Sequence, residues 1–135
     1  MASHNETGKE GEELAVKWLN DNGFEVLHRN WRHSHYEIDI VATKSHAVNS
    51  PGNSRNNNKE LKLYLHFIEV KARNFSRYGN PEDSVGKKKF KNLQRAADQY
   101  LFLNPGHKWI QYDILSITLH KFKEPDYFFI EDVFL

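Results

Sequence analysis

Two periods of hydrophobic and polar positions run along the chain and predict its secondary structure. Apolar residues spaced three and four apart predict helices at 6–22 and 85–103. Three strands in series between these helices favour an antiparallel meander, and the second helix then crosses to a further strand. We therefore expect an α/β (α+β) fold with a central mixed sheet flanked by helices. Alternating apolar and polar residues place the strands at 24–31, 36–43, 61–71, 109–119 and 127–130.

The segment at 44–60 interrupts this pattern. It is rich in asparagine and serine and has no apolar periodicity, so we predict a flexible hairpin loop there. A loop of this length is uncommon inside a compact domain and is either functional or an insertion. The chain of 135 residues has the size of one domain, so we expect a single domain over 1–135.

Charged residues occupy positions in both helices where the pattern predicts apolar ones. Glu12 lies on the same side of the first helix as Ala15 and Leu19. Lys89 lies within the apolar stripe of the second helix. The alternatives are a Glu that turns out to solvent and a Lys whose stem covers apolar surface.

Two strands carry further charges of this kind. Glu37 and Asp39 share one face of the strand at 36–43 and are either turned toward the first helix or solvated. Glu69 and Lys71 end a strand face that we expect a helix to cover, which would place both at the edge of a cleft. A salt bridge at the strand end is the alternative. The apolar residues of that face are Leu61, Leu63, Leu65 and Phe67.

Taken together, these positions indicate a cluster of acids with nearby amines. Glu12, Asp39 and Glu69 would provide oxygen ligands for a hard divalent cation, and Mg²⁺ commonly uses one or two carboxylates together with water and substrate phosphate. Lys71 would supply a positive charge or a proton acceptor beside the water that such an ion activates.

Composition narrows the classes of protein to which the chain can belong. The chain has no cysteine, which excludes a disulfide scaffold, a thiolate metal site and a cysteine nucleophile. It has no apolar run long enough to span a membrane and no secretory signal pattern, so we expect a cytoplasmic protein without membrane contact.

The net charge of +1 conceals a strong segregation of charge along the chain. Residues 71–95 contain eight basic and two acidic residues, whereas residues 1–27 contain two basic and six acidic ones. A basic segment that directly follows the Glu69–Lys71 strand is suited to phosphate, and Phe75 and Tyr78 within it are suited to stacking on unpaired bases. A solvated basic surface is the alternative. The predicted nucleic-acid contacts are Arg73, Arg77, Lys87, Lys88, Lys89 and Lys91.

Several motifs resemble those of the YraN family, also called UPF0102. They cover roughly residues 5–120, and their combination is specific although each piece is weak. The matching segments are Gly8–Ala15, Gly23–Phe24, Asn30–Arg32, Glu37–Ile40, Phe67–Arg73 and Tyr112–Ile114. The chain departs from the family pattern at Tyr36, at Gln111 and in the long 44–60 segment.

That family resembles the PD-(D/E)xK nucleases, close to the Holliday-junction resolvases, and the resemblance implies a restriction-endonuclease-like core with the order αβββαβ. It implies Asp39 and Glu69 as ligands of Mg²⁺ or Mn²⁺, with the Val70 carbonyl as a further ligand and Lys71 acting on the attacking water. It also implies that Glu12 completes the site, that Lys89 binds phosphate and that Glu37 contacts the metal ligands without binding the metal itself.

Three hypotheses about function follow. The first is a metal-dependent endodeoxyribonuclease that acts on branched or flapped DNA, with a homodimer as an option by analogy with resolvases. The second is a non-catalytic nucleic-acid-binding module that keeps the nuclease fold, and the third is an interaction protein whose charges are structural.

Overall fold

The chain folds into two helices and five strands over the residues that the computed structural model describes, which are 4–49, 59–76 and 87–133. The helices are α1 (His4–Asp21) and α2 (Lys87–Leu103). Every predicted element is present, and β4 has the predicted bounds. The strands are β1 (Glu25–His33), β2 (Tyr36–Asn49), β3 (Lys59–Asn74), β4 (Trp109–Leu119) and β5 (Asp126–Ile130).

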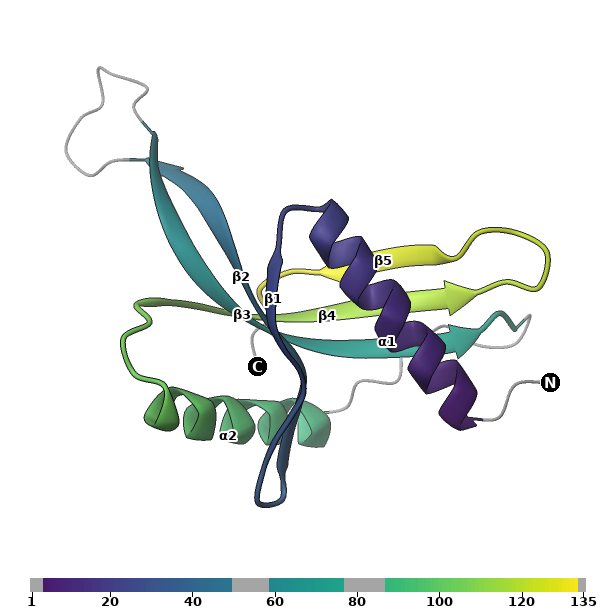
Figure 1. Cartoon of the computed structure of the whole chain (residues 1–135), viewed down its shortest axis with the longest axis horizontal. Helices are drawn as coiled ribbons and strands as arrows, with labels where there is room; N and C mark the ends of the chain where they lie inside the picture. The colour runs from purple at the N-terminus through teal and green to yellow at the C-terminus, as the bar shows by residue number, and fades with distance from the viewer. Residues whose placement is uncertain (1–3, 50–58, 77–86, 134–135) are drawn as a thin grey trace.

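The strands form a single mixed sheet in the order β1-β2-β3-β4-β5 (Figure 1). Neighbouring strands are antiparallel except for β3 and β4, which are parallel and are joined through α2. A parallel pair needs such a crossover, because a short turn cannot return the chain to the same end of the sheet. The expected α+β fold with a mixed sheet is therefore confirmed, and it is consistent with a restriction-endonuclease-like core.

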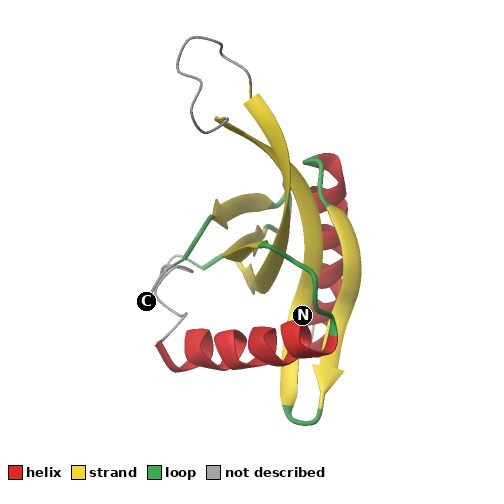
Figure 2. Ribbon diagram, turned by 90° about the vertical axis from the view of Figure 1, so that its left-hand side faces the viewer, coloured by secondary structure: helices red, strands yellow, loops and turns green. Residues whose placement is uncertain are grey.

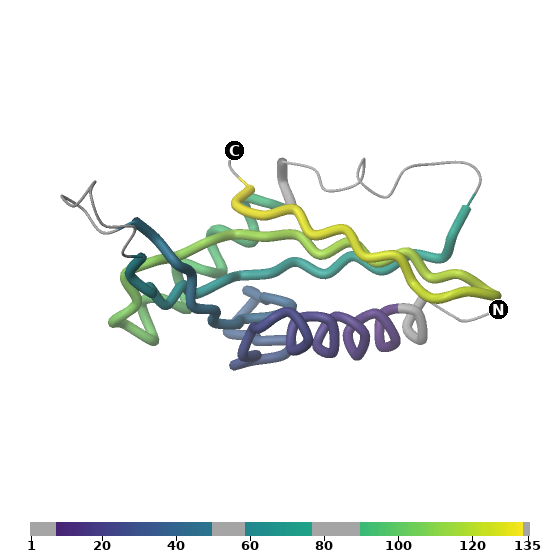
Figure 3. The backbone as a smooth tube through the Cα atoms, turned by 90° about the horizontal axis from the view of Figure 1, so that it is seen from above, coloured from purple at the N-terminus to yellow at the C-terminus, as the bar shows by residue number. Residues whose placement is uncertain are grey.

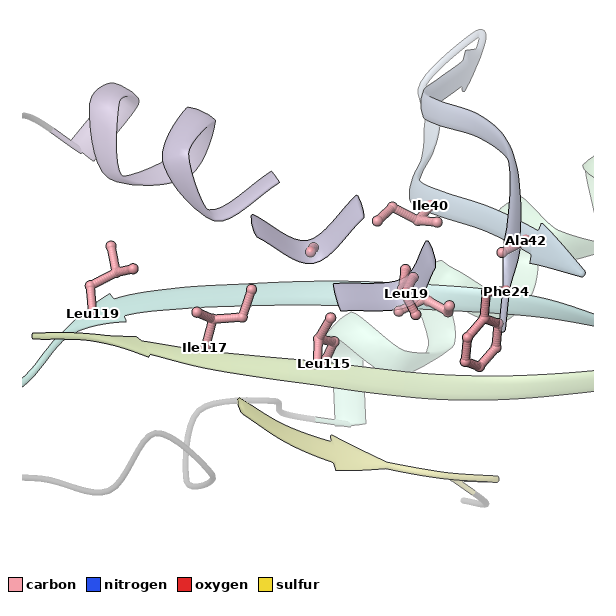
Figure 4. Packing of buried hydrophobic residues seen from close by; sticks show 9 residues of the cluster. Leu19, Phe24, Ile40, Ala42, Leu115, Ile117 and Leu119 are labelled. Atoms are coloured by element: carbon pink, nitrogen blue, oxygen red, sulfur yellow. The ribbon is translucent and has the colours of Figure 1, made fainter. Parts of the chain in front are cut away.

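The two helices lie on opposite sides of the sheet (Figure 2). Beneath α1, Ala15 and Leu19 pack on buried residues of β2, β3 and β4, as Figure 4 shows for Leu115, Ile117 and Leu119. Beneath α2, Leu93, Ala97 and Tyr100 pack on a second cluster. Its strand residues are Ile38, Val41, Leu65 and Phe67. Neither side of the sheet could bury its apolar residues without its helix.

The hairpin between β2 and β3 is longer than predicted. We expected a loop over 44–60, but residues 44–49 belong to β2 and residues 59–60 to β3, while residues 50–58 lie outside the described part of the chain. The register continues to the pair Asn49–Lys59. Ladder hydrogen bonds come from the backbone and need no apolar periodicity, which is why the pattern missed these strand ends.

The expectation that a helix covers the whole leucine-rich face of β3 is wrong for its first residues. Leu65 and Phe67 are buried beneath α2, whereas the side chains of Leu61 and Leu63 are 72% and 57% exposed. The β2–β3 hairpin extends beyond the body of the molecule, so these two leucines lie past the helix that covers the rest of the face (Figure 1).

The simple alternation predicted for β2 is also wrong. Ile38 packs in the cluster beneath α2, whereas Ile40 packs in the cluster beneath α1, although the pattern placed both on one face. The change of side occurs at Asp39. In the part of the chain that the structure describes, neither helix has the length and apolar character needed to cross a membrane.

Candidate functional site

The strands β2 and β3 separate at Asp39 and Glu69. The last pair that they form is Ile40 with Ile68. Beyond it, β2 remains paired with β1 through Ile38 and Trp31, whereas β3 continues beside β4. Figure 1 shows the two strands diverging, with the β1–β2 hairpin turning away from the part of β3 that runs along β4. We call this point the strand fork.

At the strand fork, the side chain of Asp39 accepts a hydrogen bond that a backbone carbonyl would accept in a continuous β-ladder. The backbone N–H of Val70 donates a hydrogen bond to Oδ2 of Asp39 at 2.8 Å. If the β2–β3 register continued, Val70 would lie opposite Ile38 and would bond to its backbone. Because β2 has turned away, the Asp39 carboxylate accepts this bond instead. The structure thus brings Asp39 to the middle of the Glu69-Val70-Lys71 segment.

The side chains of Glu69 and Lys71 point away from α1, on the other side of the sheet. They alternate with Val70 and Ala72, which pack in the cluster beneath α1. Both charged side chains are half-buried. The side chains of Glu69 and Lys71 therefore share the face that α2 covers at the preceding residues Leu65 and Phe67.

The donor set at the strand fork fits a hard divalent cation. Asp39 and Glu69 offer carboxylate oxygens, and the carbonyl of Val70 faces the fork because the N–H and C=O of one strand residue point to the same side. Two carboxylates and a carbonyl match the oxygen ligands of Mg²⁺ and Mn²⁺, with water and phosphate filling the other positions. Among the described residues, no three Asp, Glu or His side chains are grouped so as to hold a metal ion.

Glu12 reaches the region of the fork through Asn30. The side-chain amide of Asn30 donates a hydrogen bond to Oε2 of Glu12 at 3.0 Å. The β1–β2 register places Asn30 opposite Asp39, between the pairs Arg29–Ile40 and Trp31–Ile38. Glu12 is half-buried and does not form a three-residue metal group with Asp39 and Glu69.

Asn30 is a site residue that hydrophobic periodicity does not predict, although it belongs to the family-like segment Asn30–Arg32. Its backbone has φ of +50°, in the left-handed region that asparagine tolerates better than most residues. This conformation lies at the position where β2 changes side at Asp39. An asparagine in a predicted strand was the available signal, because asparagine is depleted in strands.

The predicted phosphate contacts are only partly described. Arg73 is half-buried on β3, on the same face as Lys71, and Lys91 is exposed on α2. Arg77 lies outside the described residues, as do the side chains of Lys87, Lys88 and Lys89. Glu37, predicted to support the metal ligands, is exposed near the tip of the β1–β2 hairpin, opposite Arg32.

A buried polar network lies beneath the α1 side of the sheet, next to Phe24. Asp113 is fully buried and accepts hydrogen bonds from Nδ1 of His66 at 2.6 Å, from the Gln111 amide at 2.8 Å and from the backbone N–H of Asp132 at 2.9 Å. Nε2 of His66 meets Nε2 of His46 at 2.9 Å. Burial, aided by His66 and Lys44, lowers the pKa of His46. Gln111, one of the departures from the family pattern, therefore donates a hydrogen bond to a buried carboxylate.

Comparisons with known proteins agree with the motif pattern. A protein from Bacteroides thetaiotaomicron named "UPF0102 protein" is 37% identical over 117 residues, which cover 87% of this chain and 83% of that protein. A "UPF0102 protein" from Phocaeicola vulgatus is 38% identical, over 90% of this chain and 86% of its own length. A third, from Flavobacterium psychrophilum, is 33% identical over 97% of this chain and 92% of its own length.

The family model extends over the whole strand fork. The model of the "Uncharacterised protein family UPF0102" matches residues 11–117, a range that includes Glu12, Asp39, Glu69 and Lys71. It begins at the helical residue that contacts β3 and ends near the end of β4. On the strength of this match and of relatives that span nearly the full chain, the protein belongs to the UPF0102 family.

Proposed function

We propose that the protein is a metal-dependent nuclease that hydrolyses phosphodiester bonds in DNA, with the strand fork as its active site. The observation that carries the proposal is the hydrogen bond from the Val70 N–H to the Asp39 carboxylate. It joins an acid of β2 to the Glu-x-Lys segment of β3, two strands that diverge at this point. This hydrogen bond brings an acid of one strand against the segment of the other strand that carries a second acid and an amine.

Each residue has a role in this proposal. Asp39, Glu69 and the carbonyl of Val70 would hold Mg²⁺ or Mn²⁺. When bound, such an ion stabilises charge that develops on phosphate and lowers the pKa of a coordinated water. Lys71, on the same face as Glu69, would orient the attacking water as an ammonium, or would take its proton as a neutral amine. Arg73, two residues further along that face, binds a neighbouring phosphate.

Glu12 and Glu37 have supporting roles. Glu12 acts through Asn30, whose amide it holds at the position opposite Asp39. This contact would keep β1, and with it the Asp39 end of β2, at a constant distance from α1. Glu37 lies two residues before Asp39 and is exposed, so its contribution is to the charge around the fork.

A cleavage assay tests the proposal. The wild-type protein is incubated with labelled single-stranded, duplex, flap and four-way-junction DNA in Mn²⁺. We expect cleavage of at least one substrate, with losses of about 100-fold or more in Asp39→Asn and Glu69→Gln, because each substitution removes a ligand charge. Glu25→Gln, at an exposed position of β1, is the matched control and should cleave like wild type. Cleavage that persists in both site variants would refute the assignment.

A second candidate function is a non-catalytic nucleic-acid-binding module. The charge of residues 71–95 favours it, since eight basic residues against two acidic ones suit binding whether or not cleavage occurs. Metal-independent binding that weakens steeply with salt, without cleavage of any substrate, would support this alternative. For either function we propose a homodimer, because a junction substrate has two strands to engage, and sedimentation at several protein concentrations tests it.

A further inference from the structure

An exposed aromatic side chain lies on the same sheet face as the fork residues. The β3–β4 register pairs Lys71 with Ser116, and the β4–β5 register pairs Ser116 with Phe128. Side chains that are paired in register point to the same side of a sheet, so Lys71 and Phe128 share one face. Figure 3 shows the three strands running side by side. Two strand spacings separate Phe128 from Lys71, which is about 10 Å.

Phe128 is exposed because its neighbours occupy the other face. Tyr127 and Phe129 pack against Trp18 of α1, with ring centroids 6.0 Å and 5.2 Å away. Strand alternation then directs Phe128 away from α1, where its side chain is 54% exposed. The exposed phenyl ring of Phe128, which is in register with Ser116 and Lys71, has no role in packing α1 on the sheet.

A second exposed ring lies at the end of β3 on this face. Phe75 is 59% exposed, and its backbone N–H donates a hydrogen bond to the carbonyl of Leu119 at 2.8 Å, which fixes its position beside β4. Its ring lies against His120, with centroids 5.1 Å apart. Lys71 and Arg73 precede Phe75 on the same face of β3. Two cationic side chains therefore share one face of the sheet with two exposed phenyl rings.

The residue of β5 that is in register with Arg73 is an acid, Asp126, which already has hydrogen-bond and ionic partners. The register aligns Arg73 with Thr118 and Thr118 with Asp126. Asp126 accepts a hydrogen bond from His120 at 2.7 Å and lies 3.9 Å from the Lys123 ammonium. The hydrogen bond from His120 lowers the pKa of Asp126. Asp126, at the outer edge of this face, is thus paired with His120 and Lys123.

We propose that this face binds an unpaired nucleic-acid strand, with one base stacked on Phe128 and a phosphate at Lys71 and Arg73. The inference rests on the proposed function and adds the class of substrate, a strand with unstacked bases such as a flap or a single-stranded end. Alternating aromatic rings and cations are the usual composition of single-strand sites, because every base has a face to stack and every nucleotide has a charge to neutralise. A purely apolar protein partner would have no need of the two cations on this face.

Binding without catalysis tests the inference. Fluorescence anisotropy is measured with a labelled oligothymidylate and with a labelled duplex, in EDTA so that no divalent ion is present. We expect Phe128→Ala to weaken binding of the oligothymidylate by about 10-fold and to leave duplex binding nearly unchanged, since stacking contributes about 1–3 kcal/mol per base. Phe128→Trp should restore binding, because it keeps an aromatic face.

Phe122 provides a matched control. It is 92% exposed and lies in the turn between β4 and β5, outside the rows that contain Lys71 and Arg73. Phe122→Ala removes a phenyl ring that is more exposed than that of Phe128 and should bind the oligothymidylate like wild type. An equal loss in the two variants would mean that exposed apolar surface in general, and not this face, supports binding.

The remaining outcomes separate the two proposals. Wild-type affinity in Phe128→Ala, or no binding of the oligothymidylate by the wild-type protein, would overturn the inference even if the protein cleaves duplex DNA. Stacking on Phe128 without cleavage of any substrate would overturn the nuclease proposal and keep this one. If Phe128→Ala instead converts a dimer to a monomer in sedimentation while the oligothymidylate affinity stays the same, the face is an interface between copies and the inference is wrong.

Discussion

Gly11 of α1 lies directly against Ala72 of β3, the residue that follows Lys71. A Cβ added at position 11 would overlap with the Cβ of Ala72, which is attached to the backbone and cannot move aside. This close approach sets the distance between the helix that carries Glu12 and the strand that carries Glu69 and Lys71.

The first prediction concerns this contact. Gly11→Ala should lower the free energy of unfolding by about 1–3 kcal/mol, because the added methyl pushes α1 off the sheet. Gly8→Ala is the matched control, since nothing lies within 4 Å of the added methyl and alanine favours the helix by about 0.5–1 kcal/mol. Urea unfolding followed by circular dichroism measures both. Equal effects of the two substitutions would contradict the contact.

The second prediction separates the structural role of Asp39 from its chemical role. Asp39→Ala removes the acceptor of the Val70 N–H and should cost about 1–2 kcal/mol of unfolding free energy. Asp39→Asn keeps an oxygen that can accept this bond, so its stability should stay within about 1 kcal/mol of wild type. Mn²⁺ should raise the melting temperature of the wild-type protein and of neither variant. A Mn²⁺-dependent increase in Asp39→Asn would show that the ion binds elsewhere.

Much of the fold follows from periodicity alone. The strand at 109–119 and the α+β order depend on local alternation, which the sequence displays directly. The fork residues Asp39, Glu69 and Lys71 were recognisable because they are charged residues within otherwise apolar strands. What alternation could not show is that β2 changes side at Asp39, because that depends on where β2 leaves β3.

Contacts between distant residues account for the other differences. Asp113 and His66 are 47 residues apart and meet only because β3 and β4 are parallel neighbours. Phe128 is exposed because Tyr127 and Phe129 pack on Trp18, a contact between the two ends of the chain. Such contacts depend on strand order and register, which a single sequence specifies only through the assembled fold.

The third prediction concerns the left-handed backbone at Asn30. Asn30→Gly and Asn30→Ala both remove the hydrogen bond to Glu12, but only glycine adopts a φ of +50° without strain. Asn30→Ala should therefore be less stable than Asn30→Gly by about 1 kcal/mol. If Glu12 supports the site through Asn30, both variants should also cleave DNA more slowly than wild type. Equal stability of the two variants would argue against backbone strain at this position.

The fourth prediction concerns pH. The pKa of His46 lies below its ordinary value of 6.5, chiefly because of burial, with His66 and Lys44 adding to the effect and Glu131 and Asp113 opposing it. Between the lowered pKa and 6.5 the unfolded chain binds more protons than the folded one. The contribution of His46 to stability is therefore complete above pH 6.5 and is lost as the pH falls through the lowered pKa.

His46→Gln tests this dependence, because the glutamine amide can still hydrogen-bond to Nε2 of His66, as donor or acceptor, but does not titrate. Urea unfolding at pH 7.5 should give similar stabilities for the variant and the wild type, and at pH 5 the variant should lose less stability than the wild type. His33→Gln, at an exposed position near the β1–β2 turn, is the control and should follow the wild-type pH dependence. If His46→Gln is as sensitive to acid as the wild type, the buried network does not couple folding to the protonation of His46.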